Sequence, residues 1–150
     1  AAAKALVTFH GQRQQMHTLK SCTLIDDTYN ASPDSMKASV SVLSSMEGVK
    51  GRRIAALADM LELGEFSKKL HEDVGKEVTS NNIDILITVG KEAKNIAKVA
   101  QENGVEHVYS YDGNQEAIEK LRKILEADDA VLVKASNSMN FKEIVENIIK

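Results

Sequence analysis

Cysteine, long apolar runs and leader segments are scarce or missing in this chain, and each shortage narrows what the protein can be. Cys22 is the one cysteine, so the sequence has neither a disulfide framework nor a cluster of thiolate metal ligands. It precedes an apolar run, which is typical of a buried, inert thiol. No apolar run approaches the roughly 20 residues that cross a bilayer, and no signal peptide is recognisable. These features favour a cytoplasmic protein without membrane contact.

Positive charge and phosphate-binding loops are also lacking. The chain has 19 Lys and Arg against 22 Asp and Glu, a formal net charge of −3, whereas nucleic-acid-binding domains carry clustered basic residues. Neither Gly-x-Gly-x-x-Gly nor Gly-x-x-x-x-Gly-Lys-Ser/Thr occurs. The histidines lack the spacing of metal ligands, and His71 is expected to be a surface or half-buried structural residue. We therefore expect no nucleic-acid partner, no metal site and no phosphate loop in this chain.

Short apolar runs alternate with helical patterns along most of the 150 residues. Expected strands cover 23–26, 54–58, 83–89, 107–111 and 130–133. Apolar residues at helical spacing predict helices over 36–46, 66–78, 93–100, 118–125 and 144–149. The second has the apolar stripe Phe66, Leu70, Val74 and Val78. Continuously apolar runs suit strands that are covered on both faces, and alternation with helices implies parallel crossovers. The pattern predicts an α/β domain at 21–150: a three-layer, Rossmann-like, doubly wound and mostly parallel sheet with helices on both faces. Residues 1–20 differ in texture and are interpreted as a lead-in with a possible edge strand at 15–19.

The stretch around the first strand end has a recognisable helix start. Asp26 and Asp27 end an apolar run, and Ser32 and Pro33 suit the N-cap and first position of a helix. A loop between a strand end and a helix start is where open α/β sheets bind ligands. Two adjacent carboxylates either hold a partner such as a metal or ribose hydroxyls, or only cap and solvate the strand end. The acidic pair alone leaves both readings open.

Parallel strands bring their carboxyl ends to one edge of the sheet, so the first strand end, Asp59, Gly90 and Lys134 should lie along the same edge. Lys134 can then pair structurally with Asp26 or face a substrate.

A receiver-like phospho-acceptor signalling domain is the alternative hypothesis. It would use the two acids of the first strand with Asp59, Thr88 and Lys134. However, Ala135 stands where receivers carry proline, and the spacing from Thr88 to Lys134 is long.

Three longer stretches carry a family resemblance. They are Asp-Asp-Thr-Tyr-Asn-Ala-Ser-Pro-Asp-Ser-Met at 26–36, Ala-Asp-Met-Leu-Glu-Leu-Gly at 58–64 and Val-Lys-Ala-Ser-Asn-Ser-Met at 133–139. In this order they resemble motifs of the C-terminal domain of the Mur ligases. The chain departs from the family pattern at Ser32, which is usually Asn. It departs again at Ala135 and Asn137, where the family usually has Lys-Gly-Ser-Arg.

The resemblance implies part of an ATP-dependent ligase of peptidoglycan biosynthesis, and thus a role in the cell wall, cell shape and cell division. The most similar pattern belongs to the member that adds D-alanyl-D-alanine to UDP-N-acetylmuramoyl-tripeptide. Such a domain closes over the ATP site of a central ATPase domain, which is missing here, and binds the incoming dipeptide. ATP and Mg then belong to the full-length enzyme. None is expected bound to this chain alone, which is predicted to be inactive.

The resemblance also implies site residues, none of them catalytic. For the nucleotide they are Arg13, Asp27, Tyr29 and Asn30. For the substrate they are Asp59, Leu61, Thr88, Ser136 and Asn137. The sheet itself predicts that the substrate loop at 134–137 faces the loops at 59–64 and 88–91, because all three loops leave strand ends at one edge and can close around a small ligand.

Overall fold

The computed structural model describes residues 6–9, 14–19 and 22–148, and its middle layer is a seven-stranded sheet of order β1-β2-β3-β7-β4-β5-β6. The strands are β1 Leu6–Phe9, β2 Gln14–Leu19, β3 Cys22–Asp27, β4 Arg53–Ala58, β5 Ile85–Val89, β6 His107–Tyr111 and β7 Ala130–Lys134. The strands from β3 to β6 in this order are parallel, and β1 and β2 are antiparallel. The mostly parallel sheet is therefore confirmed. β2 pairs with β3 as expected, but β1 lies outside it, so β2 is not the edge strand.

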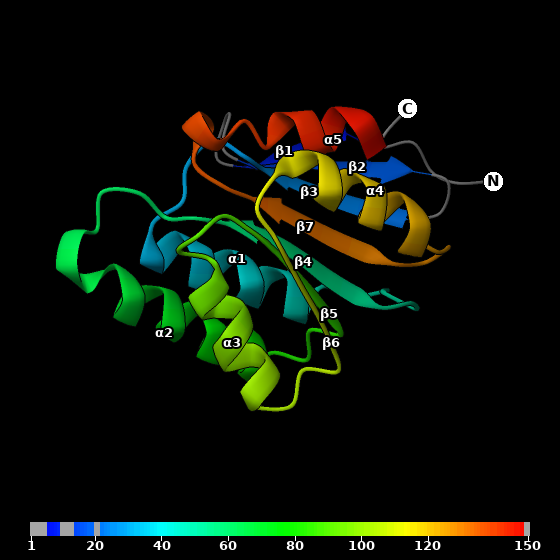
Figure 1. The fold of residues 1–150 in the computed structure, drawn as a ribbon. Coiled ribbons are helices and arrows are strands. Elements are labelled where there is room, and N and C mark those ends of the chain that lie inside the picture. The colour runs from blue at the N-terminus through cyan, green and yellow to red at the C-terminus, as the bar shows by residue number, and fades with distance from the viewer. Residues whose placement is uncertain (1–5, 10–13, 20–21, 149–150) are drawn as a thin grey trace.

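Helices cover both faces of this sheet (Figure 1). They are α1 Pro33–Ser45, α2 Ser67–Ser80, α3 Lys94–Glu102, α4 Asn114–Ile124 and α5 Lys142–Ile148, with short 3₁₀ helices η1 Gly64–Phe66 and η2 Asn137–Met139. α1, α2 and α3 lie on one face, and α4 and α5 lie on the other. Among the described residues, no helix is both long and apolar enough to span a membrane.

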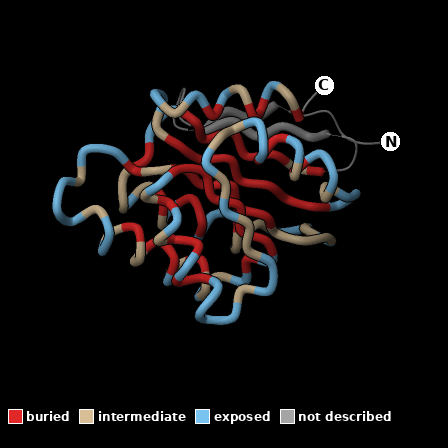
Figure 2. The backbone as a smooth tube through the Cα atoms, in the orientation of Figure 1, coloured by how far each residue is buried: buried red, intermediate tan, exposed pale blue. Residues whose placement is uncertain are grey.

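The alternation of strand side chains divides the core into two layers. Leu24 and Val133 pack with α4 and α5, whereas their chain neighbours Ile25 and Leu132 pack with α1, α2 and α3. Successive strand residues point to opposite faces, so a strand buried on both sides must be apolar at nearly every position. Figure 2 shows this burial along the central strands.

Local signals place the start of α1. Ser32 is the N-cap: its hydroxyl accepts from the Ser35 N–H at 3.2 Å, and its own N–H donates to Ser35 Oγ at 2.8 Å. Pro33 occupies the first turn, where a missing N–H costs nothing. The predicted helix start is confirmed.

Two predictions about α2 are wrong. Phe66 was expected on the buried stripe with Val74, but it lies in η1 and is 61% exposed. His71 was expected at the surface or half-buried, but it is fully buried. The helix begins at Ser67, and its buried stripe runs through His71, Val74 and Val78. A histidine therefore occupies a core position that the apolar pattern assigned to its neighbours.

The last strand is inserted into the middle of the sheet. β7 lies between β3 and β4, although β3 and β4 are consecutive parallel strands in the chain. The chain leaves β3 and β4 towards α1 and α2 on one face, but leaves β7 towards α5 on the opposite face. Neighbouring strands that send the chain to opposite faces leave a crevice at their carboxyl ends.

An ion pair between Arg52 and Asp129 lies at the amino ends of β4 and β7. Asp129 is 2% exposed, and its carboxylate accepts from Arg52 Nη2 at 2.8 Å and from the N–H groups of Arg52 and Glu126, both at 2.9 Å. Burial pushes the pKa of Asp129 upwards, but these hydrogen bonds and the Arg52 charge outweigh it and hold the pKa below its ordinary value. The ionised form of the Asp129 carboxyl group is therefore more stable in the folded protein than in the unfolded chain.

We expect Asp129→Asn to lower the free energy of unfolding at pH 7 by about 3 kcal/mol, because it removes a buried charged partner of Arg52. A lowered pKa stabilises the fold above the unfolded pKa, and this contribution is lost as pH falls through the folded pKa. The gap between variant and parent should therefore narrow below about pH 4. Urea unfolding at pH 7 and pH 3 measures both. Asp128→Asn is the control, since Asp128 is exposed and its φ of 73° suits Asn. Equal losses in the two variants would contradict the assignment.

Candidate functional site

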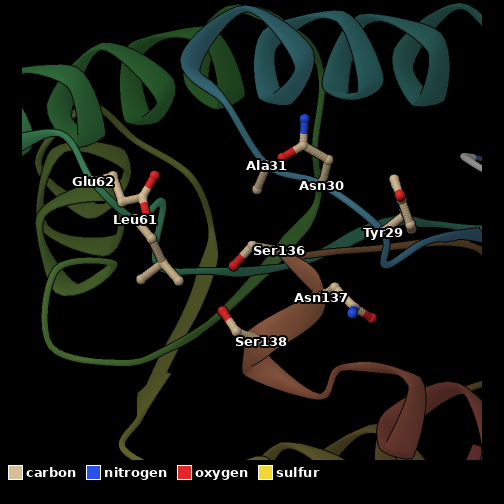
Figure 3. A pocket seen from close by; sticks show the side chains of 8 residues that line it. All are labelled: Tyr29, Asn30, Ala31, Leu61, Glu62, Ser136, Asn137 and Ser138. Atoms are coloured by element: carbon tan, nitrogen blue, oxygen red, sulfur yellow. The ribbon is translucent and has the colours of Figure 1, made fainter.

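A pocket of about 390 Å³ opens at the carboxyl ends of β3, β4 and β7. It is lined by Tyr29, Asn30, Ala31, Leu61, Glu62, Ser136, Asn137 and Ser138 (Figure 3). The lining comes from the three loops that follow these neighbouring strands. The pocket therefore lies in the crevice beside β7, where open α/β sheets bind their ligands.

The structure brings five of the predicted site residues together in this pocket: Tyr29, Asn30, Leu61, Ser136 and Asn137. Asp27, Asp59 and Thr88 do not line it, and Arg13 lies outside the described residues. Two of the four predicted nucleotide residues and three of the five predicted substrate residues thus share one crevice.

The loop at 88–91 does not take part, because β4 separates β5 from β7. Thr88 is fully buried and its hydroxyl donates to Ser110 Oγ at 3.0 Å on the neighbouring strand. Asp59 Oδ1 accepts from the Ala93 N–H at 2.7 Å, near the start of α3. Gly90 has a φ of 113°, and a Cβ there would overlap the Asp59 carboxylate. Asp59 thus ties the loop after β4 to the start of α3 and packs against Gly90, whereas Thr88 contacts β6.

Lys134 and Asp27 form a buried ion pair beside the pocket. Their side chains are 2% and 4% exposed, and Lys134 Nζ lies 2.8 Å from Asp27 Oδ2. The same oxygen accepts from Ser39 Oγ at 2.6 Å. Lys134 was expected either to form an ion pair with Asp26 or to face a substrate. It does form a structural ion pair, but its partner is Asp27 and the predicted partner is wrong.

Strand register explains the choice of partner. Asp27 lies opposite Lys134 in the parallel ladder, so their side chains leave the sheet on the same face. Asp26 is one residue earlier and points to the other face, where its Oδ1 accepts from Thr28 Oγ1 at 2.9 Å.

Two hydrogen bonds to main-chain carbonyls join the loops after β3 and β7. Lys134 Nζ also donates to the Asn30 carbonyl at 2.8 Å, and the Asn137 N–H donates to the Tyr29 carbonyl at 3.0 Å. A bond from an ammonium is stronger than one between neutral groups. The loop that carries Tyr29 and Asn30 is therefore held at two successive carbonyls.

Ser136 has an unused hydroxyl. Its Oγ is buried and has no hydrogen-bond partner among the described residues. In Figure 3 the hydroxyls of Ser136 and Ser138 point towards Leu61, whereas the Asn137 side chain points the other way. Because a buried polar atom without a partner is costly, the Ser136 hydroxyl is well placed to bind a ligand group.

Glu62 and Ser138 also line the pocket, although neither was predicted as a site residue. Both lie inside the stretches that carried the family resemblance, four residues after a strand end. Glu62 has a left-handed φ of 62°, which is unfavourable for a residue with a side chain. The motifs themselves were the signal that could have found these two residues.

Comparison with protein families decides the relationship. The family described as "Mur ligase, glutamate ligase domain" matches residues 12–137. The chain belongs to this Mur ligase family. The UDP-N-acetylmuramoyl-tripeptide–D-alanyl-D-alanine ligase of Bacillus subtilis is 34% identical over 129 residues, covering 85% of this chain and 28% of that protein. The ligase of the same name from Escherichia coli K12 is 35% identical over 125 residues, covering 81% and 26%. The chain thus spans less than a third of these relatives.

Solved Mur ligases share the fold. The MurF ligase from Thermotoga maritima in complex with ADP superimposes with a TM-score of 0.75 at 26% identity, over 95% of this chain and 31% of that one. A MurF structure from Acinetobacter baumannii gives a TM-score of 0.78 at 24% identity, over 89% and 29%.

The receiver alternative gains no support. Its parallel strands would place the second strand at one edge beside the first, whereas here the last strand separates them. Thr88 and Asp59 also form hydrogen bonds with different groups: Thr88 with Ser110, and Asp59 with the Ala93 N–H. The Mur ligase domain therefore does not assemble a receiver's phospho-acceptor site.

We expect Asp27→Asn to lower the free energy of unfolding by about 3–5 kcal/mol, because the buried Lys134 ammonium loses its charged partner. The double variant Asp27→Asn/Lys134→Met should recover part of this loss, since no unpaired charge remains. Urea unfolding of the parent, the single variant and the double variant measures the loss and its recovery. Asp34→Asn serves as the control, because Asp34 is exposed in the first turn of α1. An Asp27→Asn variant as stable as the control would show that the ion pair does not hold the fold.

Proposed function

We propose that this chain is the C-terminal domain of a longer ATP-dependent ligase that adds D-alanyl-D-alanine to UDP-N-acetylmuramoyl-tripeptide. The observation that carries the proposal is that the three motif stretches together line one pocket beside β7. Relatives that bear this ligase name match over most of the chain. A structural relative holds ADP, which supports the use of ATP.

We place the carboxylate of the dipeptide at the β7 loop. Ser136 offers a buried hydroxyl that has no hydrogen-bond partner among the described residues. Asn137 also lines the pocket, but its side chain points the other way. Lys134 does not serve this purpose, because its ammonium already bonds to Asp27 and to the Asn30 carbonyl. With Asn137 in the place of the family's arginine, no charge-assisted fork is available. Neutral donors therefore carry the carboxylate in this member.

The opposite wall of the pocket suits the other end of the dipeptide. Glu62 supplies a carboxylate for the ammonium group, and Leu61, 41% exposed, supplies an apolar surface for the methyl groups. A small zwitterion needs donors at one end and an acceptor at the other. Ser136 and Glu62 provide the two ends.

The nucleotide is proposed to lie on the side of Tyr29 and Asn30. Tyr29 is 53% exposed, and Asp27 supports this loop through Lys134. A direct contact of Asp27 or Arg13 with the nucleotide stays a prediction.

In the described residues no three His, Cys, Asp or Glu side chains gather to hold a metal ion. We assign Mg and the ATP phosphates to the central ATPase domain of the cytoplasmic full-length enzyme. Closing the domains over the reactants keeps water from the activated carboxylate.

The isolated chain should fold but neither hydrolyse ATP nor form the peptide bond, because phosphoryl transfer depends on phosphate- and metal-binding groups that the sequence lacks. The full-length enzyme should do both. Phosphate release and product formation from UDP-N-acetylmuramoyl-tripeptide and D-alanyl-D-alanine measure this. Ligation by the purified chain alone would contradict the proposal.

In the full-length enzyme, Ser136→Ala should raise the KM for D-alanyl-D-alanine about ten-fold, equivalent to a lost hydrogen bond of about 1.4 kcal/mol to a charged group. The KM for ATP should stay the same. Ser41→Ala is the matched control, because Ser41 is exposed on α1 and does not line the pocket. Steady-state kinetics with each substrate varied in turn separates the two effects. An unchanged dipeptide KM in Ser136→Ala would move the dipeptide off this loop.

A further inference from the structure

His71 is a buried polar residue that the proposed function leaves unused. It lies on α2 and is 0% exposed. Its Nε2 lies 2.9 Å from the Met60 N, and its Nδ1 lies 2.7 Å from the Ser67 carbonyl oxygen. Both ring nitrogens therefore have backbone partners, one in the loop after β4 and one in the first turn of α2.

These partners determine the tautomer. A backbone N–H can only donate, so Nε2 must accept from Met60 and carries no hydrogen. The hydrogen is on Nδ1, where it points to the Ser67 carbonyl, an obligatory acceptor. Ser67 Oγ, 3.2 Å from Nδ1, donates its own hydrogen to Glu92 Oε1 at 2.6 Å. Every donor in this chain of bonds thus meets an acceptor, and the chain ends at a carboxylate in the loop after β5.

The bond to Met60 fixes the loop that forms one wall of the pocket. Met60 immediately precedes Leu61 and Glu62, and its side chain is 1% exposed. The residue before it, Asp59, is bonded to the Ala93 N–H. The loop therefore leaves the sheet anchored at two successive residues, one to α3 and one to α2.

The loop needs such anchoring because its conformation is unfavourable for the chain itself. Glu62 is in the left-handed region at a φ of 62°, and such conformations persist only where the surroundings impose them. In Figure 3 Leu61 and Glu62 come from this loop and form the wall opposite Ser136. A loop freed at Met60 would lose the geometry of this wall but not that of the β3 or β7 loops.

We propose that His71 is a positioning residue for the amine substrate: through the Met60 N–H it holds Leu61 and Glu62 in the pocket. The proposal rests on the proposed function for its substrate, but the role of the ring does not. His71 acts on the substrate side of the pocket, so its loss affects dipeptide binding and leaves nucleotide use unchanged.

Three variants separate positioning from stability. His71→Leu fills the space but leaves the Met60 N–H without an acceptor, whereas His71→Gln restores an acceptor amide oxygen. Val74→Ala is the matched control, since Val74 is fully buried on the same helix and does not contact Met60 through a hydrogen bond. In the chain itself, long-range ¹H–¹⁵N spectra report the ring tautomer, and amide exchange reports the opening of the loop.

We expect the Nδ1–H tautomer, and amide exchange at Met60 at least about ten-fold faster in His71→Leu while Val74→Ala leaves it unchanged relative to β5. In the full-length enzyme, His71→Leu should raise the KM for D-alanyl-D-alanine about ten-fold with the KM for ATP unchanged, and His71→Gln should restore it to within about three-fold. An Nε2–H ring, equal impairment of the Leu and Gln variants, or an equal KM change in Val74→Ala would overturn the proposal. A wild-type enzyme without ligase activity would overturn the proposed function instead, and the tautomer and exchange data would then decide the role of His71 alone.

Discussion

The buried ammonium of Lys134 is the group on which the arrangement of this domain depends. It stands at the end of β7, and its bonds to Asp27 and to the Asn30 carbonyl join that strand to β3 and to the loop beyond. A charge removed from water is tolerated only when it is paired and its donors are used. The ion pair therefore permits one register of β7 against β3 and one course of the following loop.

The pocket follows from that register. Because β7 is held between β3 and β4, the loops after these three strands lie next to one another, and the chain leaves β7 on the opposite face from its neighbours. Ser136 comes two residues after Lys134, so the position of its unpaired hydroxyl is determined by the same pair. Structural support and ligand binding are thus divided between adjacent residues of one loop: Lys134 faces the core and Ser136 faces the pocket.

Local patterns in the sequence were sufficient for most of the fold. β6 at His107–Tyr111 and the Ser32 cap of α1 agree with the prediction, because apolar runs and capping residues act over a few neighbouring positions. The motif stretches correctly identified Tyr29, Leu61 and Ser136 as residues that line one pocket. The predictions that failed depend on contacts made only in the folded structure. Thr88 was expected at the site because strand ends share an edge, but only the order of the strands shows that β4 stands between β5 and β7. Asp26 was predicted as the partner of Lys134 instead of Asp27, because the partner depends on the register between β3 and β7. His71 was expected at the surface or half-buried because it is polar and the sequence does not reveal its backbone partners.

The central position of β7 also has a consequence for how the domain is made. β3 and β4 do not pair with each other, because each pairs with β7, which lies between them. β7 also follows the other six described strands in the chain, so it is synthesised after them. During synthesis β4, β5 and β6 can pair with one another, but the edges of β3 and β4 that await β7 remain open. Such pairing over long sequence separations is slow, and exposed strand edges favour association with other chains. A nascent chain that does not yet include β7 therefore has two unpaired strand edges, and its ligand pocket forms only once β7 has paired with both.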